Sequence, residues 1–337
     1  MTVRVTTLKG PEAGAYYVEA LPSYYLDSGE PPAHWRGAGA EALGLAGEVD
    51  DGDFLAVMAG NHPDNGRLLG RRFGQDSVRG FDVTASAPKS VSVLFALGDD
   101  ECRQVVLDAH DAAVATMVDW IEAHALTRFR IDGQVAVLDA EGIVVASFRQ
   151  HSSRAGDPQL HTHVVIPNRV RSPDGRWLAL DARGLKVDQR TLSALYHASL
   201  RAELRRGLGV AWRAPANGIA EMENVGDDLL AEFSSRSTAV AERVADKLER
   251  FWETYDREPT PRERWRLERE AVLDSRPAKS HDNDAASLHQ QWEQRTRALG
   301  LEPEEVIVAA VSEMPTHRRI DPTVQEHIVT QALAALA

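Results

Sequence analysis

The sequence has 337 residues, 43% hydrophobic and 26% charged, enough for one large globular domain or two ordinary ones. No apolar run reaches the roughly 18–20 residues that span a bilayer, and the start lacks a secretory signal, which predicts a cytoplasmic protein without membrane insertion. A single cysteine excludes an intrachain disulfide and a cysteine-rich zinc cluster, and the net charge of −13 argues against a basic surface over the whole chain.

The first third of the chain predicts short helices and then strands. Helical candidates lie around Glu12–Leu21 and Gly39–Leu45. Gly80–Ser86 alternates between apolar and polar residues, as a strand does. Pro88 separates it from the apolar stretch 90–97, which is either a second strand or a buried segment.

The middle of the chain predicts a long helix and most of a sheet. Asp100–Ala125 repeats apolar residues at helical spacing and predicts an amphipathic helix. Three strand candidates follow, at Gly133–Leu138, Ile143–Arg149 and Leu160–Ile166. The turn signal Ser-Pro-Asp-Gly within Asn168–Leu180 predicts a hairpin.

From about residue 188 onward, helical patterns dominate. The best candidates are Leu192–Leu208, Asp227–Tyr255, Thr260–Leu273 and Ala285–Leu299. This order predicts an α+β fold with a central sheet, followed by a C-terminal helical region. We expect a sheet-containing domain over residues 1–225, a helical region over 226–300, and a linker or the start of a following domain over 301–337.

The stretch D-P-Q-L-H-T-H, residues 157–163, carries the first candidate site. Alternate residues of a strand point to one face, so His161 and His163 project side by side, at a separation that two ligands of one metal can use. A histidine on its own is more often a structural residue than a ligand, so packing remains an alternative. The polar residues just before the pair, among them His151, favour metal binding.

Four of the six tyrosines form two doublets, Tyr16-Tyr17 and Tyr24-Tyr25. Packing is one interpretation. Adjacent residues of a helix point about 100° apart, however, so both members of a doublet cannot bury in one core. The other interpretation is a nucleophile, because a phenol with a pKa near 10 becomes useful beside a metal-polarised phosphate.

The third cluster, FDVTASAPKS at residues 81–90, places one carboxylate and one lysine at the end of a strand, either against a phosphate or in a solvated turn. The three clusters resemble the relaxase domain of MobF-type conjugative relaxases, which belong to the HUH endonucleases. The resemblance covers roughly residues 1–300. Besides the tyrosines it rests on HWRGAGAEALGLAGEVD (34–50), FDVTASAPKSVS (81–92) and SRAGDPQLHTHVVIPN (153–168).

The resemblance implies a bacterial enzyme that nicks one strand of plasmid DNA at an origin of transfer. A tyrosine attacks the scissile phosphate and leaves a 5′-phosphotyrosyl link and a free 3′-hydroxyl, and the reverse attack rejoins the strand. Tyr16 matches the primary nucleophile and Tyr24 the tyrosine of a second strand transfer, with Tyr17 and Tyr25 as their neighbours. Asp82 matches an acidic residue that orients a ligating imidazole or accepts the tyrosine proton.

The resemblance also implies a divalent metal ion, Mg²⁺ or Mn²⁺ first and Zn²⁺ or Ni²⁺ as alternatives. In the family, F-R-H precedes H-x-H by ten residues, but here Gln150 occupies the matching position and His151 comes one place later. Gln150 can fill the position through its amide oxygen, a harder and weaker ligand. Alternatively, a β-bulge brings His151 to the metal, which we prefer because imidazole binds more strongly than an amide.

DNA binding is implied by the resemblance and by the local charge. Residues 141–215 hold twelve Lys and Arg against six Asp and Glu, about +6. The hairpin at 168–180 has the shape to enter a major groove, and its tryptophan can stack on a base, although each basic residue is alternatively a solvated surface residue. The residues expected to contact DNA are Lys89, Arg154, Arg169, Arg171, Arg176, Trp177, Arg183, Lys186, Arg190 and Arg236.

As ligands and partners, the resemblance implies single-stranded DNA and a DNA hairpin at the origin, relaxosome accessory proteins and a coupling protein. Residues 1–225 would form the palm, a central antiparallel β-sheet with helices on one face, and residues 226–300 the helical fingers that close over single-stranded DNA. Family members continue into a helicase, and no G-x-x-x-x-G-K-[ST] loop occurs here, so we expect an N-terminal piece of a longer protein. Two rivals are an HUH rolling-circle replication initiator or transposase, and a non-catalytic origin-binding protein with a degenerate metal site.

Overall fold

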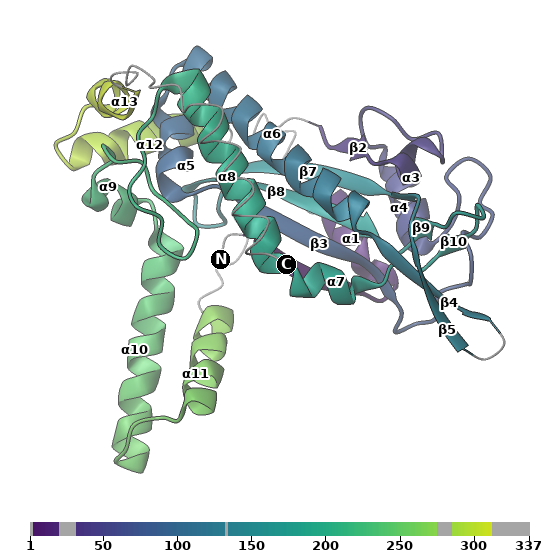
Figure 1. Cartoon of the computed structure of the whole chain (residues 1–337). Helices are drawn as coiled ribbons and strands as arrows, with labels where there is room; N and C mark the ends of the chain where they lie inside the picture. The colour runs from purple at the N-terminus through teal and green to yellow at the C-terminus, as the bar shows by residue number, and fades with distance from the viewer. Residues whose placement is uncertain (1–2, 20–31, 132–133, 275–284, 312–337) are drawn as a thin grey trace, which may run out of the picture.

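The computed structural model describes residues 3–19, 32–131, 134–274 and 285–311. Its centre is a five-stranded sheet with the strand order β1-β3-β8-β7-β2, and every neighbouring pair is antiparallel (Figure 1). The prediction of a central antiparallel sheet is confirmed. The strands are β1 (Val3–Lys9), β3 (Val78–Ser86), β8 (Pro158–Pro167), β7 (Val145–Ser152) and β2 (His34–Arg36).

Long helices cover one face of this sheet (Figure 1). They are α6 (Asp100–Ala123) and α8 (Gln189–Leu208), with α5 (Lys89–Leu97) at one end. The main hydrophobic core lies between these helices and the sheet, where Val83, Val164 and Leu160 point toward the helices. Burying apolar side chains of β3 and β8 against the helices supplies the main driving force for this layer.

A second, smaller core lies on the other face, beneath short helices. Those helices are η1 (Pro11–Ala13), α1 (Ala15–Glu19), α3 (Ala38–Glu41) and α4 (Asp51–Ala59). Tyr17, Trp35 and Phe54 pack there against Phe148 and Val165 of the sheet. The long helices are thus on one face of the sheet, as predicted. The candidate site lies on the opposite face, next to this smaller layer.

The stretch 90–97 belongs to helix α5 and is buried on nearly all sides, so the strand interpretation was wrong and the buried-segment interpretation was right. Periodicity cannot separate the two, because a helix that is apolar all round has no polar face to mark its period. Pro88 is the N-cap of α5, which explains the break seen in the sequence.

The remaining strands form two small sheets at one end of the molecule (Figure 1). One is the two-stranded ribbon of β4 (Leu126–Ile131) and β5 (Gln134–Asp139). The other joins β6 (Gly142–Ile143), β9 (Val170–Arg171) and β10 (Trp177–Leu178), in the order β10-β9-β6. β9 and β10 are the predicted hairpin, and α7 (Ala182–Val187) follows it.

The C-terminal helices divide into two groups. Helices α10 (Ser235–Tyr255) and α11 (Pro261–Asp274) project from the body as a pair (Figure 1). Helices α12 (Ala285–Ala298) and α13 (Pro303–Val311) return to pack on α5, and α9 (Asp227–Glu232) also contacts α5. Only α10 and α11 within the expected 226–300 region therefore stand apart from the sheet-containing body.

One helix of this region is tied directly to the loop before β8. The indole nitrogen of Trp292 donates to the carbonyl oxygen of Gly156 at 2.7 Å. Arg295 pairs with Asp157 at 3.1 Å and with Glu232 at 2.8 Å. The described helices include none that is both long and apolar enough to cross a membrane.

Two buried core histidines give the protein a predictable response to acid. Burial lowers the pKa of His110 well below 6.5 and that of His197 to about 4. Each ring stays neutral in the folded state and takes up a proton on unfolding once the pH falls below about 6.5. We expect the free energy of unfolding to fall between pH 6.5 and 5, by up to about 1.4 kcal/mol per pH unit for each histidine.

Urea unfolding at pH 7, 6 and 5 in the presence of a chelator would measure this slope. His197→Gln removes one of the two titrating rings and should make the slope shallower by up to about 1.4 kcal/mol per pH unit. A stability that stays flat across this range would contradict the prediction.

Candidate functional site

The predicted site residues meet on the sheet face opposite the long helices. Directly paired residues of neighbouring strands share a face, so the register of β3, β8 and β7 assembles two rows across the sheet. Asp82 lies two residues before Thr84 on β3 and therefore projects to the same face. The rows are Ser86, His161 and Gln150, and then Thr84, His163 and Phe148.

The two histidines are held in one orientation by their Nδ1 atoms. Nδ1 of His161 lies 2.8 Å from the carbonyl oxygen of Gln159, and Nδ1 of His163 lies 2.8 Å from Oδ2 of Asp82. Both partners are acceptors, so each Nδ1 carries the proton and each Nε2 keeps the lone pair that a metal requires. Burial lowers the pKa of His161 to about 4, which keeps this ring neutral near pH 7. The ring centroids lie 5.2 Å apart.

Among the described residues, the candidate for a third protein ligand is of another residue type. Within the residues that the structure describes, no three His, Cys, Asp or Glu side chains are grouped to hold a metal. Gln150 stands directly opposite His161 in the register and is only 8% exposed. Its amide oxygen is a suitable hard ligand, so the donor set of this face fits a divalent ion.

His151 occupies a different environment. The register between β7 and β8 shifts between Gln150 and Ser152, but the extra residue lies in β8, between Pro158 and His161, and not in β7 where a bulge could bring His151 to the metal. His151 therefore follows the normal alternation of β7 and projects toward the helices, where its ring lies 4.8 Å from that of Phe95 on α5. Our preference for His151 is therefore revised, because Gln150 keeps the alternation that places it beside His161.

Tyr17 is an internal part of the site. It is 3% exposed, and its hydroxyl donates to Oδ2 of Asp82 at 2.8 Å. Its ring packs 5.4 Å from Phe148 and 5.9 Å from His163, measured between centroids. Burial raises the pKa of Tyr17 far above 10, and the nearby charge of Asp82 adds to the effect. Tyr17 thus acts as a neutral donor that holds Asp82.

Tyr16 is the accessible member of the doublet. Its ring meets that of Tyr17 edge-on, with centroids 5.2 Å apart, and 36% of the residue is exposed. Nη2 of Arg154, in the turn before β8, donates to its hydroxyl at 3.3 Å. The hydroxyl therefore lies beside a cation that can also bind a phosphate. Tyr24 and Tyr25 lie outside the described residues.

Asp82 connects the tyrosine and histidine clusters. Its Oδ2 accepts from Tyr17 and His163, and its Oδ1 accepts from the hydroxyl of Thr84 at 3.1 Å. These contacts match the first of the two expected roles, the orientation of a ligating imidazole.

Arg169 differs from the expectation that it contacts DNA. It is 4% exposed, and its guanidinium carbon lies 3.6 Å from the centroid of the Phe73 ring. It donates to the carbonyl oxygens of Asn168 and Arg71. Burial lowers its pKa to about 10, so it remains a cation at neutral pH. We revise its role to an internal tie between the β9–β10 hairpin and the loop around Phe73.

The other basic candidates lie at the surface or support the strands. Arg171, Arg176 and Arg183 are exposed and pair with neighbouring carboxylates, at 3.7, 2.6 and 2.9 Å. Exposed ion pairs are weak, so a phosphate can compete for these arginines. Lys89 instead donates from Nζ to the carbonyl oxygen of Pro158 at 2.7 Å, and burial lowers its pKa to about 8. The remaining exposed candidates are Lys186, Arg190 and Arg236.

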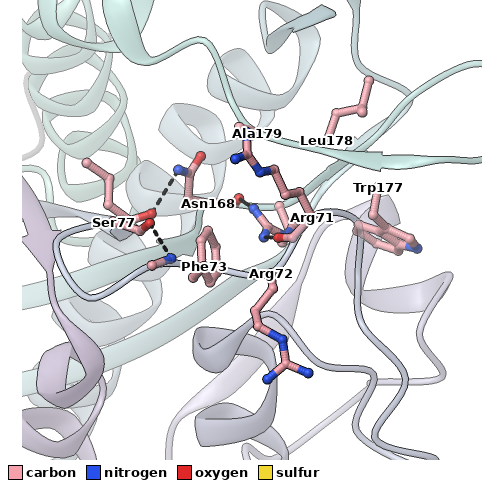
Figure 2. A pocket seen from close by; sticks show the side chains of 11 residues that line it. Arg71, Arg72, Phe73, Ser77, Asn168, Trp177, Leu178 and Ala179 are labelled. Atoms are coloured by element: carbon pink, nitrogen blue, oxygen red, sulfur yellow. Dashed lines mark hydrogen bonds between the residues drawn. The ribbon is translucent and has the colours of Figure 1, made fainter.

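A pocket of about 620 Å³ lies between the loop around Phe73 and the β9–β10 hairpin. This loop was not among the candidate DNA contacts predicted from the sequence. Figure 2 shows Arg71 and Arg72 of the loop and Trp177 of the hairpin among its lining side chains. Gly70 allows the close approach, because a Cβ there would lie 2.2 Å from the carbonyl oxygen of Trp177. The sequence signal was the pair of adjacent arginines before an aromatic residue, outside the basic segment that we counted.

The chain is similar to known conjugation proteins. The family model for TrwC relaxase matches residues 11–299. A multifunctional conjugation protein TraI of Escherichia coli is 37% identical over 246 residues, which are 69% of this chain and 13% of that protein. A protein of the same name from strain K12 is 32% identical over 302 residues, 86% of this chain and 16% of that protein. The chain thus spans less than a fifth of these relatives.

Solved structures with the same fold include DNA complexes. A metal-bound structure of the conjugative relaxase TrwC with oriT DNA has a TM-score of 0.74 at 31% identity. TrwC with a 27-mer DNA comprising the recognition hairpin and the cleavage site has a TM-score of 0.72 at 31% identity. In both cases the match covers 89% of this chain and 99% of the other.

Proposed function

Because the chain belongs to the TrwC relaxase family, we propose that it cuts one strand of DNA at an origin of transfer through a tyrosine and later rejoins it. The observation that carries this proposal is the position of the Tyr16 hydroxyl. It is accessible, it lies beside Arg154, and it belongs to the same face as His161 and His163.

The reaction follows from these positions. The oxygen of Tyr16 attacks the phosphorus and releases its proton, and the bond between phosphorus and the 3′ oxygen breaks. The 3′ oxygen takes up a proton and leaves as a hydroxyl, while the 5′ phosphate stays on the tyrosine. Arg154 binds the phosphate next to Tyr16, and Tyr17 keeps Asp82 against His163. The reverse attack by the 3′-hydroxyl restores both the strand and the tyrosine.

The metal would be held by Nε2 of His161, Nε2 of His163 and the amide oxygen of Gln150. When bound, a divalent ion supplies Lewis-acid stabilisation of the charge on the phosphate. An amide oxygen in the set favours Mg²⁺ or Mn²⁺ over softer ions. Asp82 contributes by fixing the tautomer of His163.

The pocket beside Trp177 is our proposed contact for a DNA hairpin. Arg71 and Arg72 are exposed, and the structure gives neither side chain a hydrogen-bond or ion-pair partner among the described residues. Buried Arg169 stacks on Phe73 and so keeps the loop against the hairpin of β9 and β10. Two cations next to an aromatic ring suit a phosphate backbone and an adjacent sugar or base.

Removing both cations tests this contact. We expect Arg71→Ala/Arg72→Ala to weaken binding of an origin DNA hairpin and to lower the slope of log K against log salt by about two. Fluorescence anisotropy at several salt concentrations measures both. Arg205→Ala/Arg206→Ala removes two exposed arginines from α8 and should change neither quantity. An unchanged slope in the Arg71/Arg72 variant would contradict the assignment.

We extend the proposal to its setting. The domain would act in the bacterial cytoplasm with relaxosome accessory proteins and a coupling protein, and the paired helices α10 and α11 would close over single-stranded DNA. The rolling-circle interpretation is not retained, because the matching family is one of conjugative relaxases. The accessible Tyr16 hydroxyl beside Arg154 and the shared sheet face of His161, His163 and Gln150 support the enzymatic proposal over the non-catalytic interpretation.

An adduct assay tests the central proposal. Single-stranded oligonucleotides that tile the origin of transfer are labelled at their 3′ ends, because the 5′-phosphotyrosyl link leaves the 3′-side fragment on the protein. We expect a protein–DNA band that survives denaturation, that requires Mn²⁺ or Mg²⁺, and that disappears with a chelator. Absence of the adduct with every oligonucleotide would overturn the enzymatic proposal.

A further inference from the structure

A buried polar chain lies behind the two histidines, on the helix-covered face of the sheet. Thr162, between His161 and His163 on β8, projects away from them, and its Oγ1 lies 2.8 Å from Nε2 of His110 on α6. Nδ1 of His110 lies 2.8 Å from the hydroxyl of Tyr196 on α8. Thr162, His110 and Tyr196 are all buried. This buried polar chain of Thr162, His110 and Tyr196 therefore connects β8, which carries both histidines, to α6 and α8.

A second contact ties the neighbouring strand, β7, to α6 next to the first. Arg149 of β7 stands directly opposite Thr162 in the register, next to Gln150. It pairs with Asp111, which follows His110 on α6. Two consecutive residues of α6 therefore hold β8 and β7, the two strands that carry all three proposed metal ligands.

A contribution to folding stability alone does not explain why this interface holds a buried polar chain. Burying a hydroxyl and an imidazole costs free energy that their mutual hydrogen bonds only offset, and well-packed apolar side chains would stabilise the interface as well. Hydrogen bonds are directional, however, whereas apolar contacts tolerate small sliding movements. The hydrogen bonds of the buried polar chain therefore fix where β8 lies along α6.

We propose that Thr162, His110 and Tyr196 are positioning residues for the metal site. By fixing β8 against α6 and α8, they hold the two imidazoles of His161 and His163 at the separation and tilt that a shared ion requires. This inference rests on the proposed metal site, and it assigns the buried polar chain a role in metal affinity.

The test is Thr162→Val, which keeps the side-chain shape and removes the hydroxyl. We expect the affinity of the DNA-free protein for Mn²⁺, measured by isothermal titration calorimetry, to fall about tenfold, as for other supporting contacts behind metal ligands. Thr296→Val on α12 removes an equally buried hydroxyl, which donates to the Trp292 carbonyl oxygen at 2.9 Å, and should leave Mn²⁺ affinity unchanged. Tyr196→Phe is a second variant, with a smaller loss expected.

The outcomes separate the positioning role from the metal site. His161→Ala should abolish Mn²⁺ binding, and if it does not, or if the unaltered protein binds no Mn²⁺, both the metal site and the positioning role are overturned. If His161→Ala loses binding while Thr162→Val and Tyr196→Phe bind as tightly as Thr296→Val, only the positioning role is overturned. A purely structural role would lower the melting temperature of Thr162→Val without changing its Mn²⁺ affinity.

Discussion

Replacing Tyr16 with phenylalanine is expected to reduce formation of the covalent protein–DNA adduct by more than about 1,000-fold, because the substitution removes the oxygen that we propose as the nucleophile. DNA affinity and folding should change little. The ring is already partly exposed, and the hydrogen bond that its hydroxyl accepts from Arg154 lies at the surface. A denaturing gel with 3′-labelled oligonucleotide measures the adduct, and anisotropy measures binding.

Tyr17→Phe is the matched control, because it removes a hydroxyl from the neighbouring ring. That hydroxyl is buried on Asp82, so its loss should lower the free energy of unfolding by about 1 kcal/mol and slow adduct formation only modestly. If Tyr17→Phe abolished the adduct while Tyr16→Phe retained it, our assignment would be reversed. A residual adduct in Tyr16→Phe that vanishes in Tyr16→Phe/Tyr24→Phe would come from the second doublet.

Which tyrosine of the first doublet is buried and which is exposed could not be predicted from the sequence. In the first doublet the two tyrosines do not bury together, as expected, since Tyr17 is buried while Tyr16 is exposed. Which of the two faces the core depends on where α1 lies on the sheet, and its five residues are too few to show a period.

The central sheet and the histidine face could be predicted because alternation along a strand is a local property. The resemblance implied that Asp82 lies near a ligating imidazole. Its contacts with His163 and Tyr17 follow from the pairing of β3 with β8 and the position of α1, which alternation along one strand does not predict. The burial of Arg169 could not be predicted, because it depends on Phe73, far away in sequence, rather than on the hairpin that carries it.

The choice between the two candidates for the third ligand depended on the register of β7. The sequence left both open, an amide in register or an imidazole brought in by a bulge. The register shift beside Gln150 has its extra residue in β8, so β7 keeps its alternation through His151, which the sequence alone could not show. Here the ring of Phe95 receives His151 on the helix side.

The third ligand gives the second large expected effect, because Gln150→His should tighten Zn²⁺ binding by at least about 100-fold. The substitution puts an imidazole opposite His161, where the structure has an amide, and imidazole binds Zn²⁺ and Ni²⁺ much more strongly than an amide oxygen does. Preference should therefore shift from Mn²⁺ toward these ions. Competition against a chelating dye at pH 7 measures each affinity.

Alanine substitutions at Gln150 and His151 test the same assignment by removing each candidate ligand in turn. Gln150→Ala should weaken Mn²⁺ binding about tenfold, because it deletes one of three ligands, whereas His151→Ala should leave it nearly unchanged and lower stability through lost packing on Phe95. His151→Ala therefore controls for removing a large side chain next to the site. If His151→Ala lost Mn²⁺ binding and Gln150→Ala kept it, β7 would have to change its register when metal binds. Gln150→His would then gain little, since an imidazole would already complete the set.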